Sequence, residues 1–93
     1  MSRVLLRSNA FIRAAKRLVK KDSKAADQLR MALALIEEDV FDPSLKTHKL
    51  KGDFEGSWAC SVGYDLRIVF EIVHFEGQEA ILLLTAGTHD EVY

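Results

Sequence analysis

The sequence has too few cysteines for the disulfide bonds of small secreted proteins and no apolar run long enough to span a membrane. Its 93 residues include one cysteine, Cys60, and one proline, Pro43. A single cysteine excludes an internal disulfide, which fits a reducing cytoplasm. The longest apolar runs, residues 31–36 and 80–84, are far shorter than the roughly 20 residues of a membrane-spanning helix. The first residues also lack an apolar core long enough for a signal peptide. We therefore expect a cytoplasmic protein that does not enter a membrane.

The remaining composition is that of one folded domain. Hydrophobic residues make up 48% of the chain and charged residues 29%, which excludes a disordered chain. A chain of this length buries only about 60% of its unfolded surface. We therefore expect residues 1–93 to form a single domain around one core.

The net charge of −1 hides an uneven distribution of charge along the chain. Residues 70–93 contain five acids and no Lys or Arg, whereas residues 1–24 contain one acid, Asp22, and eight basic residues. These are Arg3, Arg7, Arg13, Lys16, Arg17, Lys20, Lys21 and Lys24. Such a basic segment indicates contact with nucleic acid or with an acidic protein. The alternative is that these residues only line the solvent side of a helix.

The first half of the chain has the apolar spacing of a short strand followed by two helices. Residues 3–7 read as a strand, and Ser8 can cap a helix that runs through about Lys21. Asp22 and Ser23 then cap a second helix, from about Lys24 to Glu38. Two amphipathic helices joined by so short a turn are expected to form an antiparallel hairpin.

After Pro43 the apolar period changes from that of a helix to that of a strand. We expect strands over residues 46–50, 57–62, 66–75 and 80–85, with a turn at residues 51–56. Residues 80–85 are almost continuously apolar, as in a central strand buried on both faces. The predicted fold class is α+β: an N-terminal strand, an antiparallel helix hairpin, and then a four-stranded, mainly antiparallel sheet covered by the helices on one face.

No common signature of metal or cofactor binding occurs in the sequence. It has no glycine-rich phosphate loop, no G-x-S-x-G motif and no Cys/His spacing typical of zinc. We therefore expect neither a metal nor a cofactor.

Polar and aromatic residues that suit chemistry on RNA gather at the ends of the predicted strands. They are His48, Lys49, Lys51, Asp65, Arg67, His89 and Tyr93. Cleavage of RNA requires a base for the 2′-hydroxyl, an acid for the leaving oxygen and cations for the phosphate. Histidine, aspartate, lysine and arginine supply these groups, and an aromatic ring can stack on a base. The alternative for Asp65 and Arg67, which project from one side of their strand, is that they only neutralise each other.

Two stretches of the C-terminal half resemble a known family. They are H-K-L-K-G-D-F-E-G-S-W-A-C-S-V-G-Y-D-L-R-I-V-F, residues 48–70, and I-L-L-L-T-A-G-T-H-D-E-V-Y, residues 81–93. This pattern is similar to the RelE/ParE superfamily of bacterial toxins, and most similar to the YafQ-like branch of the RelE-type messenger-RNA interferases. Where the YafQ pattern has an acid and a histidine in the preceding strand, this chain has Ala59 and Ser61.

The resemblance implies the toxin of a bacterial or archaeal type II toxin–antitoxin system with a RelE-like fold. Such a toxin is a ribosome-dependent endoribonuclease that cuts messenger RNA by attack of the 2′-hydroxyl, without a metal. Its implied partners are the ribosome, the messenger RNA and a cognate antitoxin, with which it forms a hetero-oligomer. The antitoxin holds the enzyme inactive.

The resemblance also implies roles for individual residues. His48, Asp65 and His89 match the catalytic set of the YafQ-like branch, with His89 as general acid and either His48 or Asp65 as general base. Arg67 matches an arginine near the scissile phosphate. Lys49 and Lys51 are assigned to phosphates, and Tyr93 matches the C-terminal aromatic residue that contacts RNA.

Two alternatives keep the fold and change the function. One is a ParE-like toxin that inhibits DNA gyrase by protein–protein contact, a branch that does not need the histidines. The other is an inactive relic that only binds the antitoxin, because a shared fold does not guarantee a shared activity.

Overall fold

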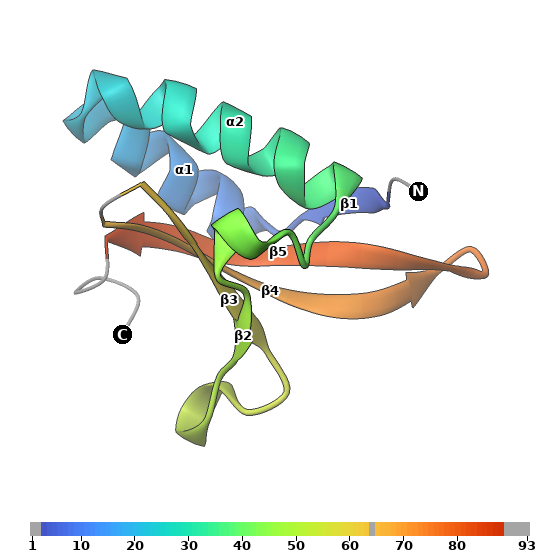
Figure 1. Ribbon diagram of the computed structural model, residues 1–93. Helices are drawn as coiled ribbons and strands as arrows, with labels where there is room; N and C mark the ends of the chain where they lie inside the picture. The colour runs from blue at the N-terminus through green and yellow to red at the C-terminus, as the bar shows by residue number, and fades with distance from the viewer. Residues whose placement is uncertain (1–2, 64, 89–93) are drawn as a thin grey trace.

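The computed structural model describes residues 3–63 and 65–88. The elements in chain order are β1 (Val4–Arg7), α1 (Asn9–Lys21), α2 (Ser23–Glu38), the 3-10 turn η1 (Pro43–Leu45), β2 (His48–Lys49), the 3-10 turn η2 (Gly52–Phe54), β3 (Trp58–Val62), β4 (Leu66–Phe75) and β5 (Gln78–Thr88). Two helices pack above one twisted sheet (Figure 1). Neither helix in this part of the chain has the length and apolar character needed to cross a membrane.

The helix hairpin begins and turns at the residues that the sequence indicates. The Ser8 hydroxyl caps α1 by accepting a hydrogen bond from the backbone N–H of Phe11 at 3.0 Å. Asp22 alone separates the helices: its N–H donates to the carbonyl of Leu18 at 3.0 Å, and its carboxylate accepts from the N–H of Lys24 at 3.0 Å. One residue thus ends α1 and starts α2, which confirms the predicted hairpin.

The sheet has five strands in the order β1-β5-β4-β3-β2. β1 pairs with β5 in parallel, from Val4 opposite Ala80 to Arg7 opposite Leu83, and every other pair is antiparallel. The longest pairing, β4 with β5, closes through Glu76 and Gly77 at φ 52° and 79°, the left-handed values of a tight two-residue hairpin. The α+β class with a mainly antiparallel sheet is confirmed.

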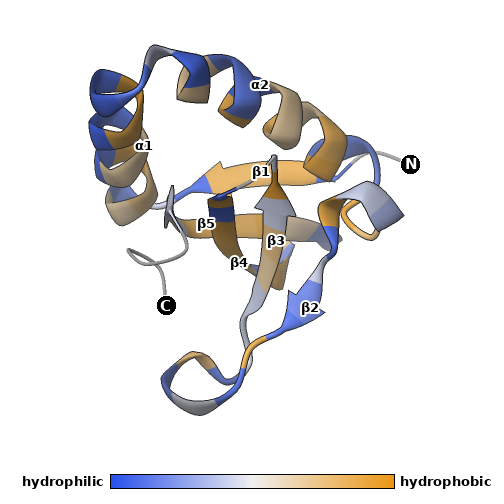
Figure 2. Ribbon diagram, turned by 60° about the vertical axis from the view of Figure 1, so that its left-hand side comes forward, coloured by the Kyte–Doolittle hydropathy of each residue, from blue (hydrophilic) through white to orange (hydrophobic). Residues whose placement is uncertain are grey.

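The main core lies between the helices and one face of the sheet. Phe11 of α1 and Ile36 of α2 are almost fully buried against alternate residues of β4, such as Ile68 and Phe70. Figure 2 shows the apolar sides of both helices turned toward the sheet. Since side chains alternate along a strand, the neighbours of Ile68 and Phe70, among them Arg67, belong to the opposite face, which we call the open face.

Two strands differ from the predicted ranges. The strand expected at residues 46–50 is reduced to His48 and Lys49, because Lys46 takes a left-handed conformation (φ 52°) at the end of η1. The strand expected at residues 80–85 extends to Gln78–Thr88. It is an interior strand, as expected from its apolar run, but Leu82 and Leu84 are only half-buried because no helix covers the open face.

Candidate active site on the open face of the sheet

The strand register brings several of the expected site residues into two neighbouring rows on the open face. In the first row, His48 of β2 lies opposite Ala59, and Ala59 lies opposite Val69. In the second row, Ser61 of β3 lies opposite Arg67 of β4. Residues opposite each other in antiparallel strands share a face. The rows are two residues apart, or about 6.6 Å along the strand, which places His48 and Arg67 within reach of one substrate.

His48 is held in a defined orientation. Its ring Nδ1 lies 2.9 Å from the backbone carbonyl oxygen of Lys46. A carbonyl only accepts hydrogen bonds, so Nδ1 carries the proton and, in the neutral ring, Nε2 carries the lone pair. The left-handed conformation of Lys46 therefore has two effects. It shortens β2, and it directs the carbonyl of Lys46 toward the ring of His48, which fixes the tautomer.

Arg67 supplies positive charge between two small residues. Its guanidinium Nη1 donates to the carbonyl of Leu66 at 3.1 Å, and the side chain is half-buried. Its register partners are Ser61 on β3 and Gly87 on β5. The strands on both sides therefore present little side-chain bulk beside the guanidinium.

Asp65 lies apart from the row of His48. It sits in the turn before β4, four residues from Val69, a separation of roughly 13 Å by strand rise. There it lines a hollow of about 210 Å³ beside the end of the helix hairpin. The lining residues are Leu18, Asp22, Ala25, Gln28, Asp65, Leu66 and Thr88. The structure thus brings Asp65 to the α1–α2 turn and the end of β5, with Arg67 between it and His48.

Lys49 and Lys51 do not join His48 in one cluster. The Lys49 ammonium lies 5.3 Å from the ring centroid of Trp58, its register partner, on the opposite side of β2 from His48. The Trp58 ring also meets the exposed Phe41 edge to face, with 5.3 Å between centroids. Lys51 is exposed and precedes η2. Lys49 therefore does not share the face of His48, because alternate residues of a strand point to opposite faces.

The comparisons with known proteins decide the family. The model of the family described as "Bacterial toxin of type II toxin-antitoxin system, YafQ" matches residues 3–93. The chain belongs to the YafQ family. Ribosome-dependent ribonuclease activity is the known role of this family, so the expected class of function, a type II toxin of ribonuclease type, is confirmed at family level. No match to a curated protein was found.

Solved structures of YafQ-family toxins and related proteins share this fold. YafQ from Escherichia coli strain BL21(DE3) is 17% identical, with 98% of each chain covered and a TM-score of 0.78. The E. coli DinJ-YafQ toxin-antitoxin complex is 18% identical, with 100% of this chain and 99% of that chain covered and a TM-score of 0.77. HP0892 from Helicobacter pylori is 28% identical, with coverages of 98% and 99% and a TM-score of 0.60.

Two residues of the YafQ-like pattern lie outside the described part of the chain. They are His89 and Tyr93, and their assignment as general acid and RNA contact stays a prediction. In sequence, His89 directly follows Thr88, the last residue of β5, whose register partner is Leu66 at the start of β4.

The departures from the YafQ pattern both fall on the open face. Ala59 is buried in the row of His48, and Ser61 lies opposite Arg67. Ser61 thus joins the candidate site beside Arg67, although it is not among the residues predicted from the sequence. The apolar side of this strand, Trp58, Cys60 and Val62, is the signal that puts Ser61 on the other face.

The described residues offer neither a reactive thiol nor a cluster of metal ligands. Cys60 is fully buried in the main core, and desolvation raises the pKa of its thiol to about 12, so the reactive thiolate is suppressed near neutral pH. Across residues 3–63 and 65–88 no group of three His, Cys, Asp or Glu side chains is arranged to hold a metal ion.

Proposed function

We propose that this YafQ-family toxin is a messenger-RNA interferase that cuts messenger RNA on the ribosome through the open face of its sheet. His48 removes the proton from the 2′-hydroxyl, whose oxygen then attacks the adjacent phosphorus. Arg67 neutralises the charge that develops on the phosphate oxygens, and His89 donates a proton to the departing 5′-oxygen. The products are a 2′,3′-cyclic phosphate and a free 5′-hydroxyl, so no metal-bound water is consumed.

One observation carries this proposal: His48 and Arg67 occupy adjacent rows of one face, with the Nδ1 of His48 bound to the carbonyl of Lys46. That bond makes Nε2 the nitrogen that carries the lone pair in the neutral ring. Asp65 is a weaker candidate for the base, because it precedes Arg67 on the chain and lies four residues from Val69, in the row of His48. We therefore favour His48 as base.

Lys51, Lys49 and Tyr93 are proposed as contacts to the flanking RNA. Lys51 is exposed in the turn that follows β2. Lys49 faces away from His48 and can reach only RNA that passes around the edge of the sheet at β2. This edge position makes Lys49 a contact to flanking phosphates, remote from the scissile one.

We also propose that a cognate antitoxin binds this protein and keeps it inactive. The family is defined by toxin–antitoxin systems, and the fold matches YafQ in the E. coli DinJ-YafQ complex. The resulting assembly is a hetero-oligomer of toxin and antitoxin.

The test is single-turnover cleavage of messenger RNA on ribosomes, with identification of the new ends. The wild-type protein should produce 2′,3′-cyclic phosphate and 5′-hydroxyl ends, and a 2′-deoxy nucleotide at the cleavage position should abolish cutting. His48→Gln should lower the rate by at least about a hundredfold, the usual contribution of a general base. His74→Gln is the matched control, since His74 is exposed near the tip of the β4–β5 hairpin. Ends bearing a 5′-phosphate, or full activity of His48→Gln, would contradict the mechanism.

A further inference from the structure

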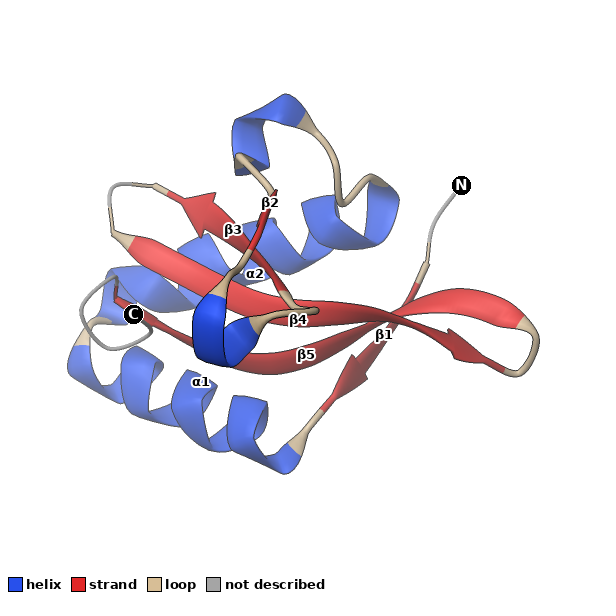
Figure 3. Cartoon of the chain, turned by 90° about the horizontal axis from the view of Figure 1, so that it is seen from below, coloured by secondary structure: helices blue, strands red, loops and turns tan. Residues whose placement is uncertain are grey.

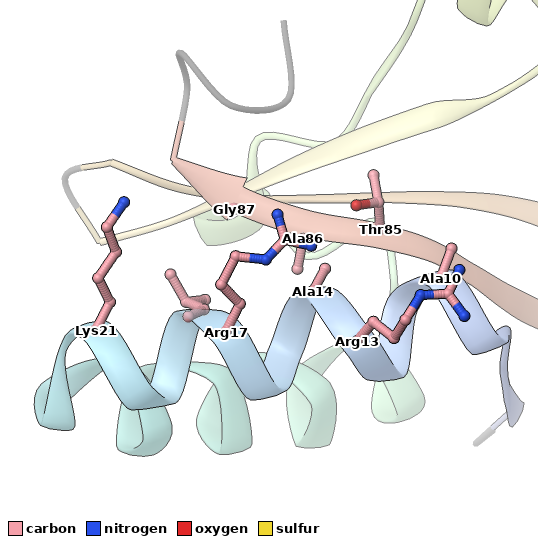
Figure 4. Close-up of a pocket in the computed structure, with 9 residues that line it drawn as sticks. Ala10, Arg13, Ala14, Arg17, Lys21, Thr85, Ala86 and Gly87 are labelled. Atoms are coloured by element: carbon pink, nitrogen blue, oxygen red, sulfur yellow. The ribbon is translucent and has the colours of Figure 1, made fainter.

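A second polar hollow lies outside the site on the open face, between α1 and β5. Its volume is about 190 Å³. The lining residues are Ala10, Arg13, Ala14, Arg17, Leu18 and Lys21 of α1 together with Thr85, Ala86 and Gly87 of β5. Figure 4 shows the long side chains of α1 reaching toward β5. We call this hollow the α1–β5 groove.

The described residues of the α1–β5 groove contribute three positive charges. Arg13, Arg17 and Lys21 are spaced by four residues, so they form one row along the helix with a rise of about 6 Å between neighbours. Of the described residues that line the groove, none is acidic. In the described part of the chain, Arg13 and Arg17 have no hydrogen bond or ion pair from their side chains, whereas Arg3 pairs with Glu79 at 3.0 Å.

The geometry distinguishes this row from the rest of the basic segment. Lys16 and Lys20, on the same helix, are exposed and do not line the groove. Lys16 and Lys20 are therefore explained as basic residues on the solvent side of a helix. Arg13 and Arg17 are not explained in this way, because they face the sheet across the groove.

The strand side of the groove adds a polar group and leads to the site on the open face. β1 pairs with β5 only as far as Leu83, so no strand among the described residues pairs with that edge of β5 at residues 85–87. At this edge the half-buried Thr85 carries a hydroxyl, whereas Ala86 and Gly87 are buried. On its other side, Gly87 is the register partner of Arg67. Figure 3 shows α1 on one side of β5 and β4 on the other. The basic row of α1 and Arg67 of β4 therefore flank the end of β5.

We propose that the α1–β5 groove binds the phosphate backbone of the RNA beyond the cleavage position. Arginine suits this role because its planar guanidinium can bind two phosphate oxygens at once. An acidic protein segment would satisfy the same charges. Continuity with Arg67 favours RNA, because a strand whose scissile phosphate lies at Arg67 passes the end of β5. The inference rests on the proposed function, since it extends the path of the same substrate.

The test compares two double variants that remove the same charge from the same helix. Arg13→Gln/Arg17→Gln empties the groove of two cations, and Lys16→Gln/Lys20→Gln is the matched control. Arginine, lysine and glutamine have similar helix propensities, and all four positions are exposed, so both variants should fold. The probe is a fluorescent single-stranded 2′-O-methyl oligoribonucleotide, which cannot be cleaved, titrated by anisotropy at several KCl concentrations.

The expected result is a change in salt dependence confined to one variant. Each lost contact to single-stranded RNA should lower the slope of log K against log [KCl] by about 0.7, so Arg13→Gln/Arg17→Gln should lower it by about 1.4. Lys16→Gln/Lys20→Gln should keep the wild-type slope. Equal slopes in both variants, or no binding by the wild type at low salt, would overturn the inference. Unchanged RNA binding with weakened antitoxin binding would instead assign the groove to an acidic protein segment.

These outcomes are separable from the test of the proposed function. If the protein binds RNA through the groove but yields no 2′,3′-cyclic ends, the inference about the groove is supported and the proposed mechanism is contradicted. If the wild type yields the expected ends but Arg13→Gln/Arg17→Gln keeps the wild-type slope of log K against log [KCl], the mechanism is supported and the inference about the groove is contradicted.

Discussion

Replacing Arg67 with alanine should separate catalysis from folding. The side chain is half-buried on the open face, and its Nη1 donates a hydrogen bond to the carbonyl of Leu66, 3.1 Å away. A single such bond contributes only about 0.5–1.5 kcal/mol net. The main core is on the other face, around Ile68 and Phe70. The free energy of unfolding should therefore fall by about 1 kcal/mol or less.

The effect of Arg67→Ala on cleavage should be much larger. A donor aimed at developing oxyanion charge contributes about 3–4 kcal/mol to the barrier. Since each 1.36 kcal/mol is a factor of ten in rate, the expected loss is roughly a hundredfold to a thousandfold. Arg67→Lys should recover part of it by restoring charge without the planar fork.

The assay for Arg67→Ala pairs single-turnover cleavage on ribosomes with thermal unfolding. For a domain of this size, 1 kcal/mol corresponds to a shift in Tm of about 4–8 °C. Arg30→Ala is the control, since Arg30 pairs with Asp27 on the exposed side of α2. A fall in the Tm of Arg67→Ala well beyond that range would make Arg67 a structural residue and refute the reasoning. Cleavage by Arg67→Ala at the wild-type rate would refute it as well.

Three further predictions address the terminal histidine, the buried thiol and a tight turn. His89→Gln should cut single-turnover cleavage at least about a hundredfold, because glutamine cannot transfer a proton; near wild-type cleavage would show that His89 only positions RNA. Since burial raises the pKa of Cys60 to about 12, above about 8.5 for an unfolded thiol, the free energy of unfolding should fall with rising pH between these values, and urea titrations should show less of this fall in Cys60→Ala. Gly63 has φ +61°, and an added Cβ would lie 2.9 Å from Nε2 of Gln28, whereas Gly52 has φ +71° and open space around it. Gly63→Ala should therefore lower Tm more than Gly52→Ala, and equal shifts would show that Gln28 simply moves aside.

The sequence by itself determined the local structure of this protein. The cap at Ser8, the break at Asp22 and the alternation through Leu66 and Ile68 are signals carried by neighbouring residues, so the two helices and the long strand could be predicted. The open face follows from the same alternation, which is why Arg67 was placed opposite the core. Those signals depend only on the spacing of residues along the chain and not on contacts with distant segments.

Only the tertiary structure decided which elements meet. The parallel pairing of Val4 with Ala80 joins residues far apart in the chain, and no local pattern specifies it. The position of His48 beside Ala59 depends on how β2 pairs with β3. Likewise, the regular spacing of Arg13 and Arg17 fits a solvated helix as well as a groove, and the choice depends on where α1 lies relative to β5. Periodicity fixes the side of an element on which a residue lies, whereas long-range packing fixes what that side faces.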